Sequence, residues 1–82
     1  MRHKILSEEK YLDLRGTPCP VNYVRCCLAL EDIKVNDLLN VDLDQGEPEL
    51  TVISGLRGSG FKVEIIYKKS SWLRIKVKRV VH

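Results

Sequence analysis

The chain of 82 residues has the size of one small domain, which leaves no room for a separate substrate domain or a buried cofactor cleft. Its composition, 44% apolar and 30% charged, is typical of a folded globular domain and disfavours disorder. The apolar runs are much shorter than a membrane span, and residues 1–10 lack the hydrophobic region of a secretory signal. We therefore expect a cytoplasmic protein that makes no contact with a membrane.

The net charge of +3 is divided unevenly along the chain. Residues 1–56 carry six basic and ten acidic side chains, whereas residues 57–82 carry eight basic side chains and one acidic side chain. This division suggests an acidic or phosphate-bearing partner for the C-terminal part. Alternatively, the charges only keep an exposed sheet soluble.

The first predicted strand covers residues 11–15, where apolar and polar side chains alternate up to a turn at Gly16. We expect residues 1–10 to form a loose extension. Proline fits the first turn of a helix, so a helix is predicted from Pro20 to about residue 33, with Cys19 extended at the N-cap. The positions expected to face the core follow helical spacing and are Val21, Val24, Cys27 and Leu28.

The second half of the chain predicts a strand, a short helix and a hairpin. The strand covers residues 38–43, and the helix covers about residues 49–57, with Pro48 in its first turn. A glycine-rich stretch, residues 58–60, ends the helix. Two strands with alternating side chains then flank a turn at residues 69–71. Their apolar positions are Phe61, Val63, Ile65 and Tyr67 in the first strand and Leu73, Ile75 and Val77 in the second.

The predicted order of elements is therefore βαβαββ in one domain, residues 1–82. A right-handed βαβ crossover makes the first two strands parallel and places both helices on one face of the sheet. The predicted fold class is α/β, a two-layer α/β sandwich with a mixed four-stranded sheet. The opposite face of the sheet is left open.

Cys19 is the residue whose position predicts chemistry. A sulfur at a helix N-terminus meets the positive end of the helix dipole and backbone N–H groups that have no helical partner, so its anion is favoured. Pro20 has no N–H, and we expect Val21 and Asn22 to supply the donors. Arg15 adds a positive charge if its side chain folds toward the sulfur. The alternative is that Cys19 is a cap residue without chemistry, although serine, threonine, aspartate and asparagine are the usual caps.

The other two cysteines are not expected to pair with Cys19. An odd count of three disfavours a disulfide scaffold, and Cys26 and Cys27 lie roughly 10 to 12 Å along the helix from Cys19, too far for a disulfide. Cys27 is predicted to be a core residue, whereas Cys26 is equally compatible with a buried and a partly exposed thiol. The histidines stand only near the chain ends, so we expect no metal site and no cysteine protease. A protein that works through a thiol needs no organic cofactor.

The segment Leu12-Asp13-Leu14-Arg15-Gly16-Thr17-Pro18-Cys19-Pro20 resembles the signature of the TusA/SirA family of sulfur-relay proteins. The resemblance extends from Tyr11 to about Val80. It implies the βαβαββ fold, which is also seen in the C-terminal domain of translation initiation factor three. It further implies that Cys19 takes sulfur from a cysteine desulfurase or rhodanese-type donor. The sulfur passes to a protein acceptor in tRNA thiolation, molybdenum-cofactor assembly or sulfur metabolism.

The resemblance also assigns roles to neighbours of the sulfur-carrying Cys19. Pro20 matches the first proline of the motif, and Arg25 matches a basic helix position. Asp13 and Gly16 match the pair between strand and turn, where Asp13 is expected to bond the N–H groups of the turn. Asn22 stands where the family has a second proline. The second helix also departs from the family, with Ser54-Gly55 and Gly58-Ser59-Gly60.

The leading hypothesis is a monomeric persulfide carrier, or sulfurtransferase, that works between a protein donor and a protein acceptor. A second hypothesis is a nucleic-acid-binding or regulatory module without thiol chemistry. It would use basic residues expected on the outward face of the hairpin, namely Lys62, Lys68, Arg74, Lys76 and Lys78. Direct contact with nucleic acid is disfavoured, because Trp72 is the only aromatic expected to be available for stacking on bases. A homodimer through the open face is a third hypothesis, which the lysines oppose.

Overall fold

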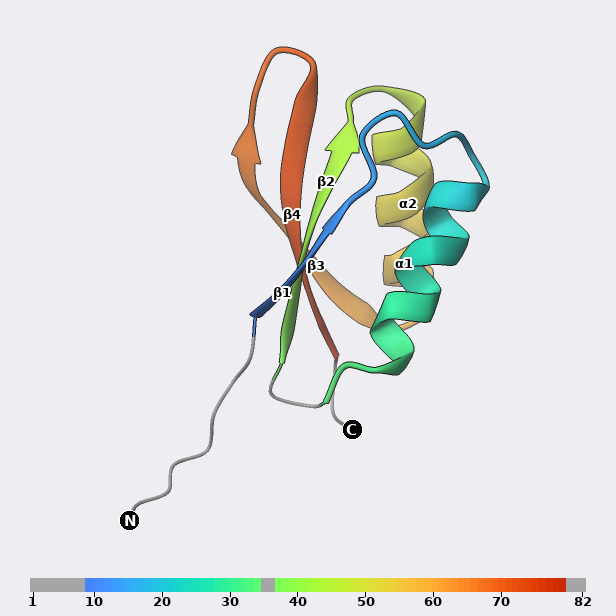
Figure 1. Cartoon of the computed structure of the whole chain (residues 1–82), viewed down its shortest axis with the longest axis vertical. Coiled ribbons are helices and arrows are strands. Elements are labelled where there is room, and N and C mark those ends of the chain that lie inside the picture. Colours follow the sequence, from blue (N-terminus) through green and yellow to red (C-terminus); the bar gives the residue numbers. More distant parts are fainter. Residues whose placement is uncertain (1–8, 35–36, 80–82) are drawn as a thin grey trace.

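A computed structural model of the chain describes residues 9–34 and 37–79. Its elements are β1 (Glu9–Asp13), α1 (Val21–Glu31), β2 (Leu38–Asp44), α2 (Glu47–Gly58), β3 (Phe61–Lys68) and β4 (Trp72–Arg79). The strands form one sheet in the order β1-β2-β4-β3, in which β1 and β2 are parallel and the other pairs antiparallel. Both helices cover the same face of this sheet (Figure 1). The predicted two-layer fold with a mixed sheet is confirmed.

Two elements begin earlier than the sequence predicts, and one begins later. β1 includes Glu9 and Lys10, which pair with β2, so these two residues are not part of a loose extension; residues 1–8 lie outside the described part of the chain. α2 begins at Glu47, with its first turn stabilised by the Glu49 carboxylate, which accepts the Gly46 N–H at 3.2 Å. α1 begins at Val21, with Pro20 as its N-cap. Cys19 therefore stands one residue before the observed N-cap, and the prediction that Cys19 is itself the N-cap is wrong.

The core lies between the helices and the covered face of the sheet. Alternate side chains of β2 and β4 point to this face, and each is at most 2% exposed: Leu39, Val41, Leu43, Leu73, Ile75 and Val77. The buried positions of α1 are Asn22, Cys26 and Leu30. From the sequence we expect a different stripe to be buried, and that prediction is wrong, because Val21, Val24 and Leu28 are 46%, 50% and 57% exposed.

Packing against the rest of the core explains the orientation of α1. Leu30 and Ile33 lie in the core cluster with β2 and β4. Residues four positions apart share a helix face, so Cys26 and Asn22 lie on the same buried face as Leu30. Apolar residues occur on both sides of α1, and the periodicity of the sequence alone did not distinguish them.

A close crossing between α1 and α2 depends on Gly55. A Cβ atom at this position would lie 2.6 Å from Cε1 of Tyr23, closer than side-chain atoms approach one another. The Tyr23 hydroxyl lies 3.1 Å from Oγ of Ser59. From the sequence, Gly55 is only a departure of the second helix from the family, whereas in the structure it makes room for the Tyr23 ring.

A bulge in β3 changes which side chains face the helices. The pairing with β4 shifts between Ile65 and Tyr67, so that Tyr67 lies opposite Arg74 and Lys68 lies opposite Leu73. Tyr67 therefore joins the open face, and Lys68 reaches Glu49 of α2, with 3.3 Å between Nζ and Oε2. The predicted uninterrupted alternation through the end of β3 is wrong at these two positions.

Candidate functional site

Cys19 lies in the connection between β1 and α1, which runs over the carboxyl end of β2 (Figure 1). Its side chain is exposed, as are Pro18 and Pro20, and the peptide bond between Cys19 and Pro20 is cis. α1 begins two residues after Cys19. The sulfur thus belongs to an accessible segment directly before a helix N-terminus.

Only one of the two N–H groups expected to serve the sulfur is available to it. The Asn22 N–H donates to the carbonyl oxygen of Pro18 at 3.0 Å, and this part of the expectation is wrong. The Val21 N–H has no hydrogen-bond partner within residues 9–34 and 37–79. The reason is the shift of the helix start, which lets Pro18 accept the N–H of a first-turn residue.

The Asn22 side chain is fully buried at the start of α1. Its Oδ1 accepts the N–H of Tyr23 at 2.6 Å, while its Nδ2 has no partner in the described part of the chain. A buried amide donor without a partner is uncommon in folded proteins. The sequence singles out this residue as a departure from a proline, but it carries no signal that the side chain turns inward.

The turn before Cys19 is tied to the end of β2. Gly16 has a φ of +80°, a backbone conformation that residues with a side chain rarely adopt. Its N–H donates to Asp44 Oδ2 at 2.7 Å. The Leu14 N–H donates to the carbonyl oxygen of Asp42 at 2.9 Å, and the Thr17 N–H donates to that of Leu14 at 3.0 Å. These bonds hold the backbone that leads to Cys19.

Asp13 and Arg15 form an ion pair on the same turn. The Arg15 guanidinium donates to both carboxylate oxygens of Asp13 at 2.9 and 3.0 Å, and the Arg15 backbone N–H donates to Oδ1 at 3.1 Å. These hydrogen bonds lower the pKa of Asp13 to about 2. The guanidinium also lies 4.8 Å from the centre of the Trp72 ring. Arg15 thereby joins the turn to β4, and none of its contacts in the described residues reaches Cys19.

A buried carboxylate, Asp42, lies at the centre of the open face and is 0% exposed. Arg74 donates to its two oxygens at 2.6 and 3.0 Å, and the Tyr11 hydroxyl donates at 2.5 Å. Burial acts to raise the pKa of Asp42, but the hydrogen bonds from Arg74 and Tyr11 outweigh it and leave the pKa lowered. The same bond to Asp42 raises the pKa of Tyr11.

Aromatic rings surround the Arg74 guanidinium of this pair. The ring centres of Tyr11, Trp72 and Tyr67 lie 5.3, 5.7 and 5.9 Å from its central carbon. The sequence places Arg74 among outward-facing charges and misses its partner. The available signal was an acidic residue between two apolar ones, in the run Val41-Asp42-Leu43.

Of the two remaining thiols, Cys27 differs from the sequence-based expectation, whereas Cys26 takes the buried one of the two environments that the sequence left open. Cys26 is fully buried, and burial raises the pKa of its thiol to about 12. Cys27 is half-buried, so the prediction that Cys27 is the core residue is wrong. Arg25 is exposed on α1, beside the exposed side chains of Val21 and Val24. From Val21 to Leu28, the exposed face of α1 that begins next to Cys19 is therefore apolar with one basic residue, and Glu31 is exposed at the far end of the helix.

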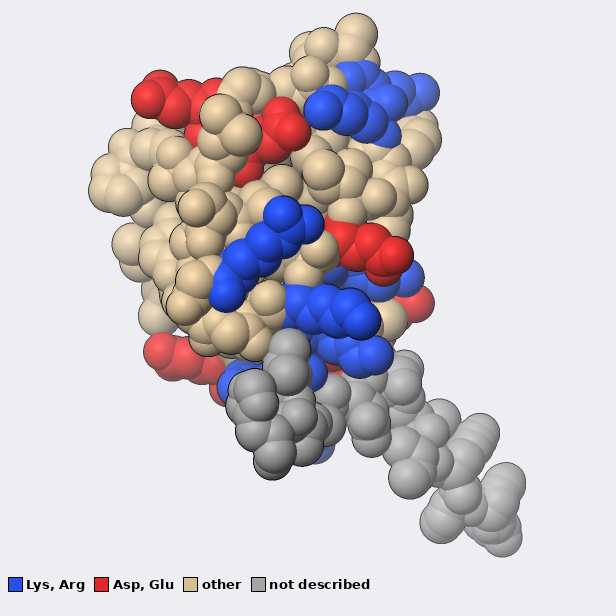
Figure 2. Space-filling view, turned by 180° about the vertical axis from the view of Figure 1, so that it is seen from behind, with Lys and Arg blue, Asp and Glu red and all other residues tan. Residues whose placement is uncertain are grey.

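The basic side chains of the hairpin are divided between two environments. Lys62, Lys76 and Lys78 line a shallow hollow of about 200 Å³ on the sheet, together with Leu38 and Glu64. Lys68 lies on the helix side, which corrects the expectation that it faces outward, and Arg74 is engaged by Asp42. Seen from behind, the molecule carries acidic and basic side chains interspersed rather than a continuous basic patch (Figure 2).

Two further observations concern metals and membranes. No group of three or more histidine, cysteine, aspartate or glutamate side chains with a metal-binding arrangement occurs within residues 9–34 and 37–79. Within the same residues, neither helix has the length and apolar character needed to cross a bilayer.

Comparisons with known proteins add to this geometry. The family model described as "Sulfurtransferase TusA" matches residues 10–79. The chain is similar in structure to a SirA-like protein from Desulfitobacterium hafniense, with a TM-score of 0.69 over 82% of this chain and 92% of that chain. The two sequences are 20% identical, so this likeness concerns the fold alone. No curated protein matches the chain.

Proposed function

Because the chain belongs to the TusA sulfurtransferase family, we propose that it carries sulfur as a persulfide on Cys19 between a protein donor and a protein acceptor. The observation that carries this proposal is the contrast among the three thiols. Cys19 is exposed before a helix N-terminus, Cys27 is half-buried, and Cys26 is buried. A sulfur that two other proteins must reach in turn has to be accessible, and Cys19 meets this requirement best.

The proposed chemistry is an exchange between sulfur atoms. The Cys19 thiolate attacks the terminal sulfur of a persulfide on the donor, which is of the cysteine desulfurase or rhodanese type. A new S–S bond forms on Cys19 as the S–S bond of the donor breaks, and the electron pair leaves with the donor thiolate. The reverse attack, by a thiolate of the acceptor, removes the sulfur. No cofactor enters either step.

The start of α1 lies directly after Cys19 in the chain. The positive end of the α1 dipole and the Val21 N–H lie next in the chain, and neither is neutralised by an acidic residue in the first turn of the helix. The turn from Leu14 to Thr17 is held by β2, which limits how far the sulfur can move. We propose that the Asp13–Arg15 pair acts by positioning this turn.

The exposed side of α1 is the surface that we assign to the donor and the acceptor. Val21, Val24 and Leu28 are about half exposed and follow one another along the helix from the Cys19 end. Arg25 stands among them as a free cation within the described residues. Apolar side chains with an arginine are enriched in the centres of protein interfaces. Once the donor and the acceptor are identified, the pathway that receives the sulfur, such as tRNA thiolation, can be tested.

Loading by a cysteine desulfurase tests the proposal. The purified protein is incubated with the desulfurase and cysteine, and its intact mass is measured without reductant. We expect the addition of one sulfur atom to the parent and none to Cys19→Ser, which keeps the size of the side chain. Cys27→Ser is the matched control, because it removes the only other thiol that is not buried, and it is expected to load like the parent.

Peptide mapping of the loaded protein locates the sulfur. An adduct on the peptide that contains Cys19 supports the proposal. Sulfur mainly on Cys26 or Cys27, or undiminished loading of Cys19→Ser, would show that another thiol is the carrier.

A further inference from the structure

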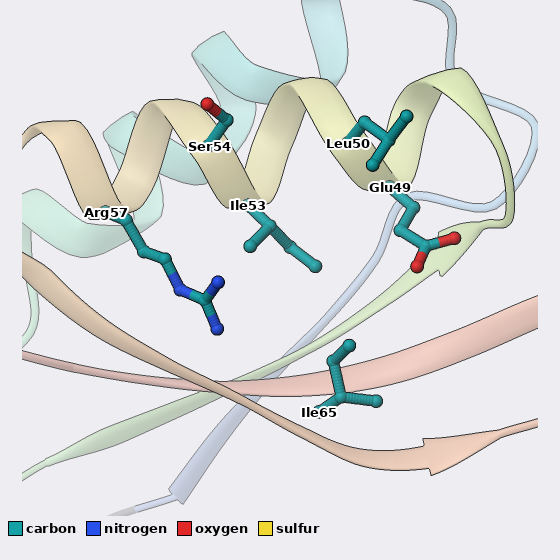
Figure 3. Close-up of a pocket in the computed structure, with 6 residues that line it drawn as sticks. All are labelled: Glu49, Leu50, Ile53, Ser54, Arg57 and Ile65. Carbon is teal, nitrogen blue, oxygen red and sulfur yellow. The ribbon is translucent and has the colours of Figure 1, made fainter.

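A groove separates α2 from β3, on the part of the molecule away from Cys19. Its volume is about 350 Å³, and its lining comes from one side of α2 and from the middle of β3. Figure 3 shows these side chains, with Ile65 on the strand facing the helix: Glu49, Leu50, Ile53, Ser54, Arg57 and Ile65. Leu50 is 68% exposed and Ile65 is 43% exposed. The exposed apolar surface of these side chains would be buried by a partner bound in the groove.

β3 is an edge strand, so a partner in this groove can contact main-chain N–H and C=O groups of β3 as well as side chains. The sheet order leaves one side of β3 without a neighbouring strand. The carbonyl oxygen of Val63 accepts Nη2 of Arg57 at 3.1 Å, so the main-chain groups of Val63 point away from β4. Strand alternation directs those of Phe61 and Ile65 to the same edge. Such an edge is a template for an additional strand.

The charges near β3 select the partner. On the opposite face from the groove, Lys62 and Lys76 line the hollow described above, with Glu64 as the only acidic residue of β3. At the far end of the strand, Lys69 follows the bulge, whereas Lys68 lies on the helix side and adds no charge to the outward side. Glu49, the acidic residue of the groove, is already paired with Lys68. A strand lying along β3 would therefore meet an excess of positive charge on its outward side.

We propose that the α2–β3 groove binds an extended segment of a protein partner in which apolar and acidic residues alternate. The segment adds to the edge of β3, its apolar side chains enter the groove beside Ile53 and Ile65, and its acidic side chains face Lys62. Its backbone N–H replaces Arg57 at the Val63 carbonyl. This mode of recognition combines main-chain hydrogen bonds with pockets for every second side chain. The site contains no part of the Cys19 segment and does not depend on the proposed sulfur chemistry.

A labelled peptide tests the proposal directly. The probe has eight residues in which valine alternates with glutamate, and it carries fluorescein for anisotropy measurements on the full chain. We expect saturable binding that weakens when lysine replaces glutamate in the probe. Lys62→Glu is expected to weaken binding of the glutamate probe and strengthen binding of the lysine probe, because the interaction is ionic.

A pair of neighbouring substitutions separates the groove from the rest of the strand. Ile65 and Ile66 are both 43% exposed, but only Ile65 lines the groove. Ile65→Gln should weaken binding about tenfold, since it removes an apolar contact of the groove, whereas Ile66→Gln should have little effect. Equal losses in the two variants would contradict the proposed site.

The role of the backbone is tested by changing the probe instead of the protein. A probe with N-methyl groups on alternate peptide nitrogens keeps its side chains but loses the donors needed for strand pairing. We expect binding of this probe to fall about tenfold or more, since tenfold is the effect of losing only one or two hydrogen bonds. Undiminished binding of the methylated probe, or no saturable binding of the parent probe, would overturn the proposal.

Discussion

The two faces of the sheet are built from the same strands but hold the protein together in different ways. On the face covered by the helices, β2 and β4 present six apolar side chains, each at most 2% exposed, and the charged Arg79 stands only at the end of β4, where it donates to the carbonyl oxygens of Leu30 and Ile33. On the open face, the same strands present Asp42 and Arg74, joined in an ion pair and surrounded by aromatic rings. Strand alternation alone separates the two sets.

This difference separates stability from positioning. Apolar burial is roughly proportional to area and has no preferred direction, so the covered face stabilises the fold as a whole. Hydrogen bonds and ion pairs are directional. Near the open face, a hydrogen bond from Gly16 to Asp44 and a cation–π contact between Arg15 and Trp72 reach the turn before Cys19. The open face therefore influences where the sulfur lies, whereas the covered face influences whether the protein folds.

Truncation on the covered face should have the largest effect on stability. Leu73→Ala removes a side chain that is 0% exposed and should lower the free energy of unfolding by about 3 kcal/mol. Leu50→Ala, at a position 68% exposed, is the control and should change it by less than about 0.5 kcal/mol. Urea titrations followed by circular dichroism measure both values. A similar small loss in the two variants would show that the covered face is not the main source of stability.

Removing the charge of Asp42 should lower the free energy of unfolding by less than Leu73→Ala does. Asp42→Asn keeps the shape of the side chain but weakens its bonds to Arg74 and Tyr11, and we expect a loss of about 2 kcal/mol. Asp13→Asn is the comparison, because Asp13 also binds an arginine through both oxygens but is exposed. Exposed ion pairs contribute little, so its effect should be clearly smaller. A larger loss of stability in Asp13→Asn than in Asp42→Asn would mean that the buried ion pair stabilises the protein less than the exposed one.

The same pair predicts how stability depends on pH. The pKa of Asp42 is lowered in the folded protein, so its contribution is complete above the unfolded pKa of about 4 and is lost as the pH falls through the folded value. As the pH falls below about 5, the free energy of unfolding of the parent should therefore decrease more steeply than that of Asp42→Asn. Parallel slopes for the two proteins would contradict a lowered pKa. Urea titrations at a series of pH values provide the measurement.

The smallest effect is expected at the turn itself. Gly16→Ala introduces a side chain at a φ of +80° where no atom lies within 4 Å, so only backbone strain opposes it, at a cost of about 1 kcal/mol. Gly58→Ala also meets no atom within 4 Å, but it lies at the end of α2 without a positive φ and should not destabilise. Thermal unfolding compares the two. The rate of alkylation of Cys19 should change in Gly16→Ala alone.

Much of the fold could be predicted because its signals are local. Alternation of side chains marks each strand, and glycine and proline mark the ends of the helices, so the order βαβαββ and the two-layer sandwich follow from neighbouring residues. The position of Cys19 before α1 depends on the same signals, with an error of one residue at the helix start. Its role as the carrier of sulfur stays a prediction that loading experiments test.

Only the tertiary structure decided which side of each element faces inward and which polar groups meet. The buried stripe of α1 depends on Leu30, Ile33 and the crossing at Gly55, because either side of that helix is apolar enough to be covered. The bulge after Ile65 depends on pairing with β4, and it exchanges the faces of Tyr67 and Lys68. Asp42 and Arg74 are far apart in the chain and meet only through the register of β2 with β4. A sequence records local preferences, whereas such contacts are chosen by the packing of the whole molecule.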